Sequence, residues 1–233
     1  MNEVGRIEQL WRYPVKSFLG EARDAVRLDG RGVEGDRLFA VRDARGKLGS
    51  GKTTRRFQRI DGLFRFQAAW GEGVPEIVFP GGRRIPGDDP RVHAALSEAL
   101  GQPVTLAREA AVSHFDAGAV HLVSTASLRW LGALLGGTVD ARRFRPNLVV
   151  DAPGEGAVEQ EWRGAVLRVG AEVELRVAGP TERCVMVGFA QPGLGEDAHI
   201  LAELAARAGA CFGVYADVVT PGTVSVGDAV TLA

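Results

Sequence analysis

The chain of 233 residues could form one large domain or two small ones, and its 45% hydrophobic and 24% charged residues are typical of a globular protein. A net charge of −1 argues against general binding to nucleic acid or to a membrane surface. No apolar run approaches the roughly 20 residues of a membrane span, and the first residues lack the apolar segment of a signal peptide. We therefore expect a cytoplasmic protein without nucleic-acid or membrane partners.

The first third of the chain predicts short strands. Apolar segments at 4–13, 25–28, 38–42, 64–69 and 76–79 are each bounded by glycine or proline. Several short strands with turn signals at this spacing favour a barrel or a sandwich.

Three helices are predicted, each ended by glycine. The first has Asp89 as N-cap and Pro90 as its first residue, and ends before Gly101. Ser124 can cap a second helix that ends before Gly136, and a third ends before Gly209. Further strands are expected at 120–123, 147–150, 165–169, 173–177, around Cys184, at 213–219 and in a hairpin element at 223–232.

The order of these elements predicts a β-rich α+β fold with two domains. Residues 80–103 form a polar segment rich in glycine and proline around one helix. The boundary between the two domains is expected near this segment. We expect a β-barrel-like domain at 1–105 and a second β-barrel domain with peripheral helices at 106–233.

Residues 46–53, GKLGSGKT, satisfy the phosphate-loop pattern of nucleotide hydrolases in full. That motif must leave an apolar strand and open a helix, but RDAR at 42–45 reads as a polar turn. Gly62 would also cut short any helix that followed. A glycine-rich hairpin tip, with Lys52 solvated or facing a cleft, is therefore favoured over a nucleotide hydrolase.

Cys184 is the most informative residue for chemistry. It follows Arg183 directly, and nearby positive charge favours the thiolate, which is both the nucleophile and the metal ligand. The alternative is a small buried hydrophobe in an apolar strand. Cys184 and Cys211 are the two cysteines of the sequence, and they form no disulfide framework.

Several segments together resemble the MOSC family, named for the C-terminal domain of molybdenum-cofactor sulfurases, and its N-terminal β-barrel partner domain. They are YPVKS at 13–17, GDR at 35–37, HLVSTASL at 121–128, RRFRPN at 142–147, TERC at 181–184, FGVYA at 212–216, PG at 221–222 and GD at 227–228. Each motif is short, but together they follow the family order over nearly the whole chain. The nearest functional resemblance is to amidoxime-reducing components.

This resemblance implies a molybdenum–molybdopterin cofactor in the cleft between the two domains, with Cys184 as catalytic residue and metal ligand. A soft thiolate suits such a metal, and the cofactor phosphate needs cations and bidentate donors. The resemblance places eight residues around the cofactor: Lys16, Ser17, Arg37, Arg143, Arg145, Asn147, Arg183 and Tyr215. Ser124, Thr125 and Ser127 join them at a predicted helix N-terminus, where backbone N–H groups favour anions.

Each of these residues also has a structural interpretation. Ser124 can serve only as a cap, Asn147 can be a turn residue after proline, and Tyr215 can belong to the core. The segment 187–189, VGF, lacks the hydroxyl residues that relatives often carry after the cysteine.

By the same resemblance, the protein is expected to be an oxidoreductase that reduces small N-hydroxylated substrates. Two cysteines cannot hold an iron–sulfur cluster, so electrons would come from a separate donor protein of flavoprotein or ferredoxin type. The alternative is a carrier that delivers the cofactor, or sulfur held on Cys184 as a persulfide, without redox turnover.

Overall fold

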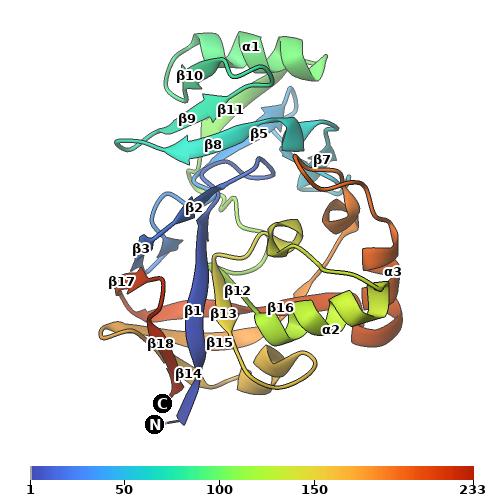
Figure 1. Cartoon of the computed structure of the whole chain (residues 1–233). Coiled ribbons are helices and arrows are strands. Elements are labelled where there is room, and N and C mark those ends of the chain that lie inside the picture. Colours follow the sequence, from blue (N-terminus) through green and yellow to red (C-terminus); the bar gives the residue numbers. More distant parts are fainter. Residues whose placement is uncertain (1) are drawn as a thin grey trace.

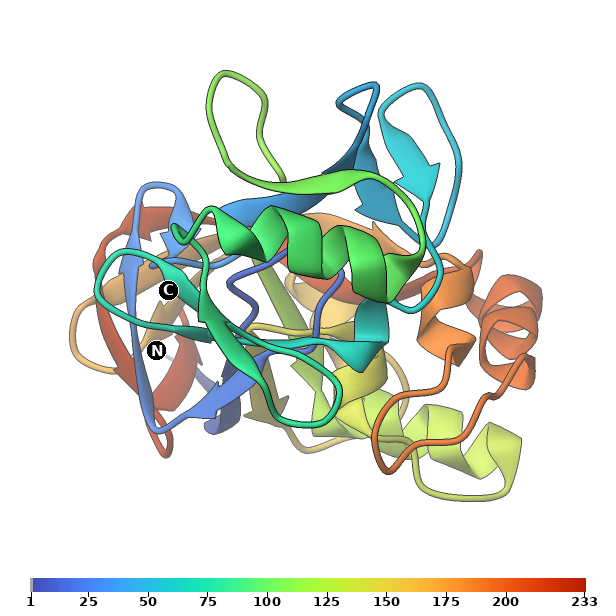
Figure 2. The ribbon, with the colours of Figure 1, turned by 90° about the horizontal axis from the view of Figure 1, so that it is seen from above.

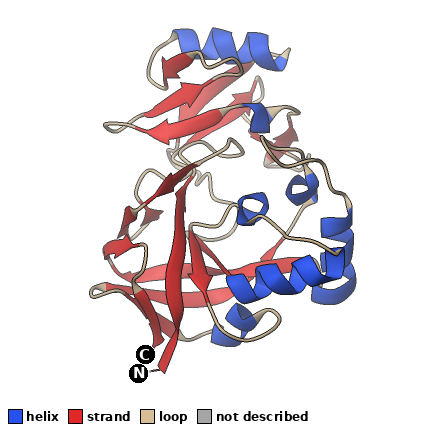
Figure 3. Cartoon of the chain, viewed as in Figure 1, coloured by secondary structure: helices blue, strands red, loops and turns tan. Residues whose placement is uncertain are grey.

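The computed structural model describes residues 2–233, and strands dominate it, with helices at the periphery (Figures 1 and 3). The predicted β-rich α+β class is confirmed. None of the α-helices within the described residues has the length and apolar character needed to cross a bilayer.

A closed seven-stranded barrel forms the larger body of the molecule. Its strands in order around the barrel are β1 (Asn2–Arg12), β13 (Leu148–Asp151), β12 (Val120–Ser124), β16 (Cys211–Thr220), β15 (Val173–Glu182), β14 (Val166–Val169) and β18 (Ala229–Leu232). Pairing of β18 with β1 closes the ring, and β12 and β13 are the one parallel pair within it. The short β2 (Glu21–Arg23) extends the sheet from β1, and both termini lie at the end of the barrel far from α1 (Figure 1).

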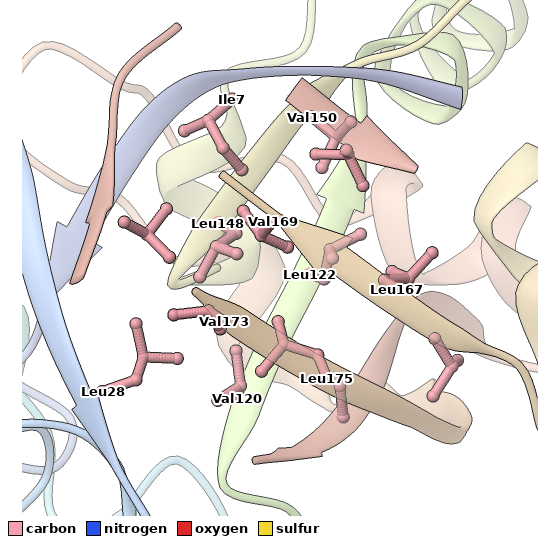
Figure 4. Close-up of a cluster of buried hydrophobic side chains, with 14 of the residues drawn as sticks. Ile7, Leu28, Val120, Leu122, Leu148, Val150, Leu167, Val169, Val173 and Leu175 are labelled. Atoms are coloured by element: carbon pink, nitrogen blue, oxygen red, sulfur yellow. The ribbon is translucent and has the colours of Figure 1, made fainter. Parts of the chain in front are cut away.

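Alternation of side chains along the strands fills the barrel. In β15, Val173, Leu175 and Val177 are buried, whereas Glu174 and Arg176 between them are more exposed. Matching residues of the other strands meet them in one apolar cluster (Figure 4). Burial of this cluster removes apolar surface from water and is the main source of stability for the barrel.

Helices cover one side of the barrel (Figure 1). They are α2 (Thr125–Leu135), α3 (His199–Ala208) and the 3-10 turns η2 (Ala141–Phe144), η3 (Val158–Trp162) and η4 (Val185–Gly188). Val123 on the outer face of β12 packs with Leu131 of α2 and Leu204 of α3 in a second cluster. Strand β12 is therefore buried on both faces.

The N-terminal unit consists of two small sheets and α1 (Arg91–Leu100). One sheet contains β11 (Val104–Arg108), β5 (Phe39–Asp43), β6 (Leu48–Ser50) and β7 (Phe57–Arg59), and the other contains β10 (Arg84–Pro86), β9 (Pro75–Val78) and β8 (Gln67–Trp70), preceded by η1 (Leu63–Arg65). Helix α1 lies over these strands in the view from above (Figure 2), and its fully buried Val92 and Leu96 join their core.

Strands from both sides of the predicted domain boundary pair with each other. Strand β1 begins the chain and belongs to the barrel, and β11, which contains residue 105, pairs with β5 of the N-terminal unit. A three-stranded sheet of β17 (Gly222–Ser225), β3 (Ala25–Asp29) and β4 (Gly32–Val33) also joins the two ends of the chain.

The observed helices end at the predicted glycines, but two strand predictions were wrong. Gly101, Gly136 and Gly209 all end helices with positive φ. The predicted hairpin at 223–232 does not form, because β17 pairs with β3 while β18 pairs with β1 and β14. The predicted strand around Cys184 ends at Glu182, and Cys184 instead precedes η4.

The phosphate-loop interpretation fails as the sequence suggested. Strand β6 lies inside the motif at 46–53, pairs with β5 as a hairpin and is followed by β7 rather than a helix. This segment therefore lacks the strand–loop–helix geometry that binds nucleotide phosphates.

Candidate functional site

A cavity of about 260 Å³ lies between the N-terminal unit and the barrel. Most of its polar and reactive lining comes from nine residues singled out in the sequence: Lys16, Ser17, Arg37, Arg143, Arg145, Asn147, Arg183, Cys184 and Tyr215. The two bodies contribute jointly, so the cavity exists only when the strands of both are in place.

The end of the β15–β16 ladder fixes the position of Cys184. Glu182 pairs with Cys211, and the backbone N–H of Arg183 donates to the Ala210 carbonyl at 2.7 Å. Cys184 follows at once, is half-buried, and lines the cavity. Cys184 therefore lies in the short connection between the end of β15 and η4.

Positive charge is concentrated around the cavity. Six basic residues line it, namely Lys16, Arg37, Lys52, Arg143, Arg145 and Arg183, against two acidic ones, Asp116 and Glu182. The whole chain has a net charge of −1, so this excess is local. A partly enclosed cluster of this kind attracts and holds anions.

Two buried guanidinium groups carry nitrogen atoms without hydrogen-bond partners. Nη2 of Arg145 and Nε of Arg183 are both buried and have no partner within residues 2–233. One other nitrogen of each group is anchored, because Nη1 of Arg145 donates to the Phe18 carbonyl and Nη2 of Arg183 donates to the Phe144 carbonyl at 2.7 Å. Burial, and then repulsion from Arg37, lowers the pKa of Arg145 to about 10. Free donors of this kind suit an anionic ligand.

Lys16 is nearly inaccessible, yet it is paired with a residue at the cavity mouth. Its Nζ lies 2.9 Å from Oδ2 of Asp116, and the two side chains are 4% and 51% exposed. Burial lowers the pKa of Lys16, and Asp116 opposes that effect. The pair therefore connects the interior of the cavity with solvent.

Arg37 is held rigidly from three sides. It pairs with the fully buried Asp36, donates to the Arg145 carbonyl at 2.9 Å and reaches Oδ1 of Asn147 at 3.3 Å. Asn147 also accepts from the His121 backbone and donates to the Trp11 carbonyl. The amide of Asn147 therefore ties β1 and β12 together and positions Arg37.

Backbone strain gathers at the same place. Within residues 2–233, four non-glycine residues have positive φ, and Ser17, Arg37 and Arg145 among them line the cavity. Such a conformation costs about 1–3 kcal/mol for each residue and is often found at functional sites.

His121 and Tyr215 form a cross-strand pair that faces the cavity. They are directly opposite each other on β12 and β16, with ring centroids 5.7 Å apart. Burial, with repulsion from Arg183 and Arg37, lowers the pKa of His121 well below 6.5, so the ring is neutral. Burial and Asp116 raise the pKa of Tyr215, so its hydroxyl keeps its proton at neutral pH.

Comparison with known families decides the assignment. Residues 97–231 match the MOSC domain, and residues 4–81 match the MOSC N-terminal beta barrel domain. The chain belongs to the MOSC family. No curated protein sequence matched the chain.

The chain is also similar to solved structures at low sequence identity. The YuaD protein from Bacillus subtilis is 16% identical, with a TM-score of 0.54, and the match covers 97% of this chain and 94% of that one. YiiM from Escherichia coli is 13% identical, with a TM-score of 0.45, and the match covers 100% of this chain and 70% of that one. At such identities the likeness with YuaD concerns the fold alone.

Contrary to the expectation, three predicted cofactor-binding residues of this MOSC protein do not line the cavity, and each has a partner elsewhere. Ser124 and Ser127 bond the buried carboxylate of Glu159, and Ser124 also caps α2 by accepting from the Ser127 backbone. Thr125 donates to Asp151 at 2.9 Å. The N-terminus of α2 therefore already has an internal carboxylate beside it.

Arg143 lines the cavity but its guanidinium is used structurally. It donates to the Gly195 carbonyl at 2.7 Å and contacts the Val187 and Phe189 carbonyls at 3.4 and 3.5 Å. Arg143 thus holds the segment 187–195 that follows Cys184.

Other residues that line the cavity were not predicted from the sequence, or their position was left undecided. Ser50 and Lys52 come from the phosphate-loop-like segment, and Lys52 does face the cleft as one interpretation allowed. Asp116 lies in a connecting loop without a motif, so only the fold brings it to Lys16. Within residues 2–233, no group of three His, Cys, Asp or Glu side chains is arranged to hold a metal ion.

Proposed function

We propose that this MOSC protein binds a molybdenum–pterin cofactor in the cavity, with Cys184 as the protein ligand of the metal. The observation that carries the proposal is the meeting of a half-buried thiol with two buried, unpaired guanidinium nitrogens, on Arg145 and Arg183, in one cavity. A soft thiolate suits a metal with sulfur ligands, and the guanidinium groups suit the cofactor phosphate.

The other residues have supporting roles. Lys16 and Arg37 add positive charge, while Ser17 fixes the strand–loop junction by donating its hydroxyl to the Gly49 carbonyl at 3.1 Å. Asn147 and Arg143 position Arg37 and the segment after Cys184. Cys184 supplies one thiolate, so the cofactor's dithiolene sulfurs would provide further ligands.

We further propose that the loaded protein reduces small N-hydroxylated compounds. The N–O bond breaks, the nitrogen gains two electrons, and two protons convert the products to an amine-type nitrogen and water. When bound, the cofactor supplies the two-electron chemistry. The electrons come from a separate donor protein of flavoprotein or ferredoxin type.

The two protons that this reduction consumes are delivered by side chains of the protein itself. The Tyr215 hydroxyl retains its proton at neutral pH and lines the cavity. Asp116 is half-exposed and bonded to Lys16, so it offers a path for protons from solvent.

The test is reduction of an N-hydroxylated substrate by protein from a host that makes the cofactor, with a reduced viologen as electron donor. We expect turnover in wild type and in Cys211→Ser, and its loss in Cys184→Ser. Cys211 is a matched control because it is also half-buried but does not line the cavity. Wild type that holds the metal without any turnover would instead support the cofactor carrier. Full activity of Cys184→Ser would contradict both.

A further inference from the structure

A second pocket of about 430 Å³ lies next to the cavity. Met186 lines both spaces, so one flexible side chain stands between them. Its sulfur lies 3.9 Å from the Ser50 hydroxyl, and a Cβ on Gly51 would approach its Cγ to 2.3 Å. The close packing of Met186 over the Gly51 backbone therefore depends on the absence of a side chain at Gly51.

The walls of the second pocket are largely apolar and carry little net charge. Ile60, Leu63 and Phe64 line one side, and Phe189 meets Phe64 edge-on with ring centroids 6.4 Å apart. At the rim, Arg59 and Asp61 neutralise each other at 2.9 Å. An apolar or aromatic group without net charge is the ligand such walls favour.

One polar side chain that lines this pocket has an unpaired atom. Gln191 is 8% exposed, and its buried Nε2 has no hydrogen-bond partner among residues 2–233. Two backbone hydrogen bonds with Leu194, at 2.9 and 2.8 Å, fix its position in the chain. A buried amide donor without a partner suits a ligand with a hydrogen-bond acceptor.

We propose that the second pocket binds the aromatic portion of a neutral aryl N-hydroxylated substrate whose ring carries an acceptor group for Gln191. Met186 then separates the ring from the cavity that holds Cys184, and its movement opens the connection. This assignment of substrate class rests on the proposed function, but the pocket itself can be tested without the cofactor.

The first experiment measures binding to the protein without cofactor. Fluorine NMR follows 4-fluoroacetophenone, which has a ring and a carbonyl acceptor, and fluorobenzene, which lacks the acceptor. We expect Gln191→Leu to weaken binding of 4-fluoroacetophenone by about fivefold, the loss typical of one hydrogen bond, without weakening that of fluorobenzene. Equal weakening of both, or no binding of either by wild type, would overturn the proposal.

A blocking variant provides a second readout. Ala190 lines the pocket and is exposed, so Ala190→Trp can fill the mouth without disturbing the core. Ala206→Trp, on an exposed position of α3, is the matched control for an added surface aromatic. We expect Ala190→Trp to reduce 4-fluoroacetophenone binding at least tenfold and Ala206→Trp to leave it unchanged. Equal binding by the two variants would contradict the proposal.

Turnover separates this inference from the proposed function. In loaded protein, Gln191→Leu should lower the ratio of kcat/KM for 4-methoxybenzamidoxime to that for hydroxylamine by about fivefold, mainly through KM. Ring binding without any molybdenum would leave the pocket assignment intact and refute the proposed function. Turnover with an unchanged ratio would refute the pocket assignment alone.

Discussion

The two sides of the same barrel strands differ in their chemistry. On β12 and β16, Leu122 and Val214 pair inside the barrel, while the neighbouring pair of His121 and Tyr215 faces the cavity. The inner pair gains stability by leaving water, whereas the outer pair and its cationic neighbours lose hydration. The barrel interior therefore supplies stability, and the cavity consumes part of it.

The cavity carries several costs that the barrel interior does not. Ser17, Arg37 and Arg145 have left-handed backbone, and unpaired guanidinium nitrogens are buried beside them. Features of this kind persist where the surrounding structure fixes them, which is how binding sites are preorganised. Substitutions on the two sides should therefore act on different properties.

The largest effect is expected inside the barrel. Leu122 is fully buried, and Leu122→Ala should lower the free energy of unfolding by about 3 kcal/mol, because it removes packed methyl groups and leaves a cavity. Val219→Ala is the control, since Val219 on β16 is 45% exposed and should change stability by less than about 0.5 kcal/mol. Urea denaturation measures both, and similar losses would contradict the assignment of the core.

A smaller effect depends on pH and comes from a buried histidine that contacts β5 of the N-terminal unit. His114 is fully buried, and Arg42 can only donate to its Nε2, 3.0 Å away, so the ring accepts there while neutral. Burial, with repulsion from Arg42, lowers its pKa from 6.5 to about 4. As the pH falls below 6.5, the unfolded chain binds a proton at His114, whereas the folded protein binds it only near pH 4. The free energy of unfolding therefore decreases as the pH falls from 6.5 to about 4.

The loss attributable to His114 should reach about 2 kcal/mol between pH 7.5 and 5. Denaturation curves at these two pH values should show this dependence in wild type and in His199→Gln, which changes an exposed histidine. His114→Gln should lose about 2 kcal/mol less between pH 7.5 and 5 than wild type does, whatever its free energy of unfolding at neutral pH. An identical slope in all three proteins would show that His114 titrates normally.

The smallest effect is expected for a cavity cation. Arg183→Met removes one hydrogen bond to Phe144 together with a buried unpaired nitrogen, so stability without ligand should change by no more than about 1 kcal/mol. Phosphate at ten times its dissociation constant should stabilise wild type by about 1.4 kcal/mol. The same concentration should stabilise Arg183→Met by less than half as much.

Thermal unfolding with and without phosphate, at constant ionic strength, measures this difference. Arg207→Met is the matched control, because Arg207 lies exposed on α3, pairs with Glu203 and does not line the cavity. Phosphate responses that are equal in Arg183→Met and Arg207→Met would show that the cavity is not the anion site.

Local signals in the sequence were sufficient for the helices and for much of the cavity. Glycines at helix ends determine where the chain can turn, so Gly101, Gly136 and Gly209 were predictable. Cys184 and the arginine motif at 142–147 were found because their residue types carry chemistry and their order resembles the MOSC family.

Features that depend on distant pairing could not be read from the sequence. The entry of β1 into the barrel requires contacts with β13, in the second half of the chain, and with β18, near its other end. Ser124 at a helix start looked like an anion site, but the partner of its hydroxyl is Glu159, 35 residues away. Asp116 was missed for the same reason, because 100 residues separate it in the sequence from Lys16, its partner in the folded protein.

The most direct test of the central claim is molybdenum content per chain, measured by elemental mass spectrometry after purification from a host that makes the cofactor. We predict nearly one molybdenum per chain in wild type and in Cys211→Ser, and a loss of most of it in Cys184→Ser. Molybdenum retained equally by all three proteins, or absent from wild type, would contradict the assignment of the cavity as a site built around Cys184.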